Sequence, residues 1–109
     1  MIPKTFRLPK NNIKQVLHKG QRLDEKYFSY KYIHSNKKVS RFCVIVSSKV
    51  DAKAVKRNLL RRRIYETIRL NKEILSAACD IIIIAKKGAT EIKFEELTQE
   101  ITKSLKKIK

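Results

Sequence analysis

Residues 54–66 read AVKRNLLRRRIYE and predict a long helix from about Ala54 to Leu70. Leu60, Ile64 and Ile68 recur at four-residue steps, which is the spacing of a buried helix face. A second apolar ridge, Val55 and Leu59, predicts that the helix packs on two sides. At about 100° per residue, the polar side chains share an arc of roughly 140°. That arc carries Arg57, Asn58, Arg61, Arg62, Tyr65 and Arg69.

The predicted helix has an unusual density of like charge. Basic residues occupy five of eight positions, namely Lys56, Arg57, Arg61, Arg62 and Arg63. Like charges one turn apart repel by a few tenths of a kcal/mol per pair, and phosphate would relieve that repulsion. The planar arginine fork binds phosphate at two points, and Asn58 can read a base edge or a 2′-hydroxyl. We therefore expect an RNA-binding face, with a basic amphipathic helix for a membrane or an acidic protein as the alternative.

The charge of the whole chain points the same way. The net charge is +17, from 27 basic and 10 acidic residues. Such a field attracts polyanions and makes their binding strongly salt-dependent. Between Lys26 and Tyr65 the only acid is Asp51, whereas four acids lie between Glu91 and Glu100. The middle of the chain is therefore the expected nucleic-acid site, the alternative being a merely solvated basic surface.

The remaining pattern predicts one α+β domain over residues 1–109, with the order α-β-β-α-β-α. A short helix begins at Asn11 or Asn12 and ends at Gly20 in a left-handed conformation. We expect three or slightly more strands. They include 27–33, with alternating aromatic residues, 41–47, apolar throughout and so expected to be central, and 80–85, apolar on both faces. The last helix covers about 94–108.

Other classes of site find little support in the sequence. His18 and His34 lack an acidic partner at a fixed spacing, and Asp51, Glu66 and Asp80 are scattered, so we expect no catalytic residue and no metal site. Cys43 and Cys79 lie in or beside apolar runs and should be reduced and buried. No apolar run approaches the roughly 20 residues of a membrane helix, so we expect a cytoplasmic protein without a membrane partner.

Ser48-Lys49 followed by residues 54–66 resembles the signature of the bacterial ribonuclease P protein family, in which Arg-Asn is followed by paired basic residues on a helix after a strand. The resemblance extends over nearly the whole chain. It implies a two-layer α/β sandwich with a left-handed βαβ crossover, similar to the second domain of ribosomal protein S5. It also implies a non-catalytic subunit that helps a catalytic RNA remove the 5′ leader from precursor tRNA. The RNA subunit would require Mg²⁺, perform the hydrolysis and bind one copy of the protein.

Charge and resemblance together predict the RNA-binding residues. They are Lys49, Lys53, Lys56, Arg57, Asn58, Arg61, Arg62, Arg63 and Arg69. The loop before the helix is one residue longer than is common in the family. Tyr65 replaces the usual arginine, and Arg63 or Arg69 could supply the missing charge.

The resemblance also places a cleft for the tRNA leader at Ile13, Leu17, Ser29 and Lys31. These side chains cannot stack on bases as aromatic rings do, so we expect a more electrostatic grip on the leader. Phe28, Tyr30 or Tyr32 could substitute, or these rings could belong to the core. A ribosomal-type or general RNA-binding protein, a DNA-binding protein and a protein-only nuclease are the alternative functions.

Overall fold

A four-stranded sheet with the strand order β1-β2-β4-β3 forms the centre of the molecule. The structure is a computed structural model that describes residues 6–71, 75 and 78–108. The strands are β1 (Gln21–Asp24), β2 (Phe28–His34), β3 (Arg41–Ile45) and β4 (Cys79–Ala85). β2 pairs antiparallel with both β1 and β4, whereas β3 pairs parallel with β4. The parallel pair is joined through a helix, as the family resemblance implies.

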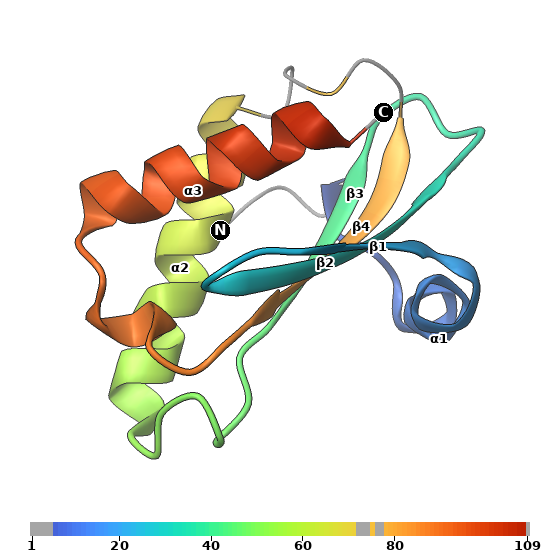
Figure 1. Ribbon diagram of the computed structural model, residues 1–109. Helices are drawn as coiled ribbons and strands as arrows, with labels where there is room; N and C mark the ends of the chain where they lie inside the picture. Colours follow the sequence, from blue (N-terminus) through green and yellow to red (C-terminus); the bar gives the residue numbers. More distant parts are fainter. Residues whose placement is uncertain (1–5, 72–74, 76–77, 109) are drawn as a thin grey trace.

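Two helices cover one face of the sheet and a third covers part of the other (Figure 1). α2 (Ala54–Asn71) and α3 (Phe94–Lys107) enclose the main core, which includes Phe28, Tyr30 and Phe42. α1 (Lys10–Lys19) lies on the opposite face, where Val16 packs in a smaller cluster with Ile82. A short 3₁₀ helix, η3 (Ala89–Glu91), precedes α3. The α+β class is confirmed, with one more strand than the minimum of three.

The position of the strands corrects two expectations. β4 is buried on both faces, as its isoleucine run predicts, and it is one of two inner strands, the other being β2. The prediction that 41–47 is central was wrong, because β3 ends at Ile45 and lies at the sheet edge. Phe42 and Val44 are buried in the main core, whereas Cys43 and Ile45 on the other face are only half-buried beside the smaller cluster. Leu8 N–H donates to Phe42 O at 2.8 Å along the outer edge of β3. β1 was not predicted, because Leu23 is its only apolar residue.

The first helix ends at Gly20 as predicted, but its predicted start and the predicted conformation of Gly20 were wrong. α1 begins at Lys10 after an extended Pro9, and not at Asn11 or Asn12. Gly20 has φ −71° and ψ 152°, which is extended backbone and not left-handed. A glycine is needed there for space, because a Cβ would clash with the carbonyl oxygen of Val16 and lie 3.1 Å from that of Tyr32. The end of α1 is thus pressed against β2.

Cys43 and Cys79 form no disulfide, as predicted. Cys79 is buried and Cys43 is half-buried. Burial raises the pKa of both thiols, so both remain protonated and weakly nucleophilic at neutral pH. They contribute packing and no evident chemistry.

Candidate nucleic-acid interface

α2 is held on the core by a single buried stripe. Leu60, Ile64 and Ile68 are almost completely buried, as their spacing predicts. The prediction that a second ridge of α2 is packed was wrong, because the side chains of Val55 and Leu59 are 79% and 40% exposed. The helix therefore presents a broad surface to solvent.

One flank of α2 carries the predicted phosphate-binding side chains. Asn58 and Arg62 are exposed, and Arg57 and Arg61 are partly exposed beside them. Arg61 Nη2 donates a hydrogen bond to Asn58 Oδ1, which orients both side chains on the surface. The four residues form what we call the RN face, defined as Arg57, Asn58, Arg61 and Arg62. A nucleic-acid backbone laid on this face would meet at least three guanidinium groups.

Two members of the predicted arc differ from the RN face. Arg69 forms an ion pair with Glu66 at 2.5 Å, which raises the pKa of Arg69 and lowers that of Glu66. Much of the positive charge of Arg69 is therefore balanced by Glu66 of the same helix. Tyr65 points toward the sheet, where its hydroxyl accepts a hydrogen bond from Val44 N–H at 3.2 Å, and burial raises its pKa. The family's arginine position is thus used here for packing.

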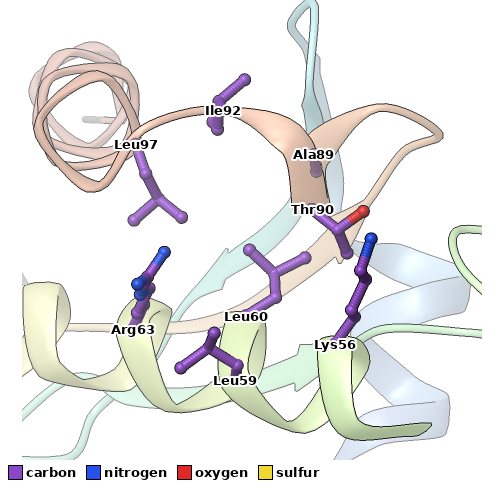
Figure 2. Close-up of a pocket in the computed structure, with 8 residues that line it drawn as sticks. All are labelled: Lys56, Leu59, Leu60, Arg63, Ala89, Thr90, Ile92 and Leu97. Atoms are coloured by element: carbon purple, nitrogen blue, oxygen red, sulfur yellow. The ribbon is translucent and has the colours of Figure 1, made fainter. Parts of the chain in front are cut away.

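Lys56 and Arg63 lie on the other flank of α2, facing η3 and α3 (Figure 2). They border a shallow pocket of about 130 Å³ whose apolar wall includes Leu60 and Leu97. The Arg63 guanidinium carbon lies 5.6 Å from the centre of the Phe94 ring, a cation–π contact. The first turn of α3 carries Glu95 and Glu96, so this flank has mixed charge. The predicted basic residues are thus divided between two surfaces.

The loop that enters α2 is organised around Asp51. Its Oδ1 accepts from Lys53 N–H and its Oδ2 from the Thr90 hydroxyl, each at 2.9 Å. The same Arg57 that belongs to the RN face donates from Nη1 to the carbonyl oxygens of Asp51 and Ala52, at 2.8 and 3.0 Å. Lys53 is exposed beside these bonds. In the sequence, the only signal for this role is the isolation of Asp51 among basic residues.

The predicted leader positions come together between α1 and β2. Ser29 is buried, Ile13 is half-buried, and Lys31 Nζ donates to the carbonyl oxygen of Leu17 at 2.9 Å. Lys31 therefore caps the last turn of α1 while keeping its positive charge at this surface.

Phe28 and Tyr30 are completely buried in the main core, so they cannot receive bases. Tyr32 is partly buried against the same core. The alternative that these aromatic rings belong to the core is therefore confirmed.

Within the described residues, no group of three or more His, Cys, Asp and Glu side chains could hold a metal ion. In the same part of the chain, no helix is long and apolar enough to span a bilayer.

Comparison with known proteins identifies the family. The sequence model of the family "Ribonuclease P" matches residues 2–109. The chain belongs to the ribonuclease P protein family. A ribonuclease P protein component from Desulforapulum autotrophicum is 33% identical over 108 residues, covering 98% of this chain and 92% of the relative. One from Petrotoga mobilis is 32% identical over 103 residues, covering 91% and 86%.

Solved structures of the ribonuclease P protein family share the fold. The protein from Thermotoga maritima matches with a TM-score of 0.86 and 27% identity, covering 94% of this chain and 97% of that one. The Staphylococcus aureus protein at 2.0 Å matches with a TM-score of 0.75 and 28% identity, covering 96% and 93%. Ribonuclease P proteins work with an RNA subunit, so the surfaces described above belong to a protein of a ribonucleoprotein.

Proposed function

We propose that this protein binds the catalytic RNA of ribonuclease P through the RN face and the loop before it, and helps that RNA remove the 5′ leader of precursor tRNA. The observation that carries the proposal is the RN face itself. Its arginines lie side by side on a helix, and neither nearby carboxylate pairs with their guanidinium groups. The Asp51 carboxylate accepts from Lys53 N–H and the Thr90 hydroxyl, and the Glu66 carboxylate pairs with Arg69. The face therefore keeps an unbalanced positive charge that polyphosphate would neutralise.

The contribution of the protein to cleavage would be electrostatic and geometric. Catalytic RNA and precursor tRNA are both polyanions, and a protein of net charge +17 between them reduces their repulsion. In this proposal the RNA subunit holds Mg²⁺ and performs the hydrolysis, and one protein binds one RNA. Less Mg²⁺ is then required for the two RNAs to come together.

The leader would bind along α1 and β2. Lys31 supplies charge there, whereas Ile13 and Leu17 offer apolar contact without stacking. Because a stacked base contributes about 1–3 kcal/mol, this surface should hold the leader weakly and with strong salt dependence. The preference for precursor over mature tRNA would follow from that additional contact.

Reconstitution tests the proposal. The protein is mixed with its cognate catalytic RNA, and cleavage of precursor tRNA is followed while Mg²⁺ is lowered. The proposal expects a single cut that leaves the mature 5′ end, and cleavage at Mg²⁺ concentrations where the RNA alone is inactive. A general RNA-binding protein would bind both RNAs without this stimulation, and that result would reject the proposed function.

A further inference from the structure

Asp51 stands in the middle of the most basic part of the chain, where a carboxylate opposes RNA binding. It is the only acid between Lys26 and Tyr65, and it lies three residues before the helix of the RN face. Simple electrostatics therefore makes Asp51 unfavourable for a protein that must attract phosphate. Its contacts show what it contributes instead.

Three hydrogen bonds converge on this residue from two separate parts of the chain. The carboxylate accepts from Lys53 N–H, two residues on, which is the local turn that aspartate favours. Its second oxygen accepts from the Thr90 hydroxyl in η3, which is 39 residues away in sequence. The Asp51 carbonyl oxygen accepts from Arg57. The two bonds to the carboxylate lower the pKa of Asp51, the Lys53 N–H contributing most and the Thr90 hydroxyl next.

The partners of Asp51 are themselves well anchored. η3 follows Gly88, whose φ of 95° lies in the left-handed region that glycine favours, and Ala89 beside it is buried. Figure 2 shows Thr90 and Ala89 lying over Leu60 and Lys56 of α2. The hydroxyl of Thr90 is thus a fixed point on the body of the protein. A loop bonded to it has lost much of its freedom before RNA arrives.

We propose that Asp51 is a positioning residue that holds the loop 47–53 and the Arg57 guanidinium in the arrangement that RNA binds. The inference rests on the proposed function and adds the residue that organises its loop. Lys49 and Lys53 are exposed on this loop. Holding them in place reduces the ordering that binding would otherwise require, which raises affinity without a new contact.

The sign of one substitution separates this role from plain electrostatics. Asp51→Ala removes a negative charge, so the charge effect alone would tighten binding to the catalytic RNA. Positioning predicts the opposite, a loss of affinity of about three- to tenfold, which corresponds to one or two hydrogen bonds. Thr90→Val leaves the charge unchanged and should weaken binding by a smaller factor. The matched control is Glu91→Gln, an exposed acid next to Thr90, which should leave affinity unchanged or raise it slightly.

The salt dependence of binding distinguishes positioning from a general loss of stability. Affinity for the catalytic RNA is measured over a series of KCl concentrations with each protein shown to be folded. If the loop lysines lose their phosphates, the slope of log K against log salt should fall in Asp51→Ala by up to about 0.7–0.9 per lost contact. Unfolding of part of the sample would lower the apparent affinity at an unchanged slope.

The two proposals fail in different ways. Tighter or unchanged binding by Asp51→Ala, with the slope of the wild type, would overturn the positioning role while leaving the proposed function intact. If the wild-type protein does not bind the catalytic RNA, the proposed function itself fails. Should Asp51→Ala not fold, Thr90→Val decides the question, because unchanged affinity and slope in that variant would also overturn the inference.

Discussion

Removal of two arginines from the RN face should change the salt dependence of RNA binding by a calculable amount. The perturbation is the double substitution Arg61→Gln and Arg62→Gln. Neither guanidinium supports the loop, unlike that of Arg57, and Arg62 is exposed, so the fold should be retained. Arg57 is left in place because its loss would also release the loop carbonyls that it holds.

The expected magnitude follows from counterion release. Each phosphate neutralised by a basic side chain contributes about 0.7–0.9 to the slope of log K against log salt. If each arginine binds one phosphate, the slope should fall by about 1.4–1.8 in the double variant. The assay is fluorescence titration of the catalytic RNA at several KCl concentrations and constant Mg²⁺.

The control removes the same charge from another surface. Lys103→Gln with Lys106→Gln lowers the net charge by two on the exposed side of α3. This variant keeps the RN face, so its slope should change far less than that of the arginine variant. Equal changes in both variants would show that only net charge matters, and the assignment of the RN face would then be refuted.

Three further predictions concern the scaffold. The Arg41 side chain is 14% exposed and donates to the Asp80 carboxylate at 2.8 and 2.9 Å. Asp80→Ala removes that carboxylate and should lower the free energy of unfolding, measured in urea, by about 3–5 kcal/mol. A loss below about 1 kcal/mol would show that the pair behaves like a surface pair. The Asp51 carboxyl should titrate by NMR below the ordinary aspartate pKa of 3.8, and Thr90→Val should move its midpoint upward. Because the folded-state pKa is lowered, this carboxylate stabilises the fold above pH 3.8, and the stabilisation is lost as the pH falls through the folded-state pKa. A titration midpoint at or above 3.8 would contradict the hydrogen bonds to this carboxylate. Gly20→Ala should lower the free energy of unfolding by about 1–3 kcal/mol, because the added Cβ meets the backbone of α1 and β2. An unchanged melting temperature would show that α1 can shift freely.

Periodicity predicted the elements whose burial follows a simple rule. The four-residue spacing of Leu60, Ile64 and Ile68 identified the buried stripe of α2, and the isoleucine run of β4 identified a strand that is buried on both faces. Both signals are local in sequence, because α2 is buried on one face and β4 on both, and each kind of burial leaves its own spacing of apolar residues. β1 has no such signal, since its place depends on backbone pairing with β2 and not on its own side chains.

The errors have a common physical origin in contacts between distant segments. β3 was expected to be central because it is apolar, but Phe42 and Val44 are buried by the main core, and that burial does not require a second neighbouring strand. Gly20 was expected to be left-handed, but the proximity of β2 is what requires it.

The same reason limited the description of the candidate site. Charge identified the RN face, but no pattern shows that the Arg57 guanidinium bonds to loop carbonyls. Nor does any pattern show that Asp51 meets Thr90 across 39 residues. Such contacts depend on the assembled fold.

Site-directed cross-linking tests most directly whether RNA lies on the RN face. A photoactivatable reagent is attached to Arg62→Cys or, in a second protein, to Lys103→Cys. The native thiols should label poorly, since burial raises the pKa of both. After assembly with the catalytic RNA and irradiation, the account predicts a cross-link from position 62 and little or none from position 103. Strong cross-linking from position 103 with none from position 62 would contradict it.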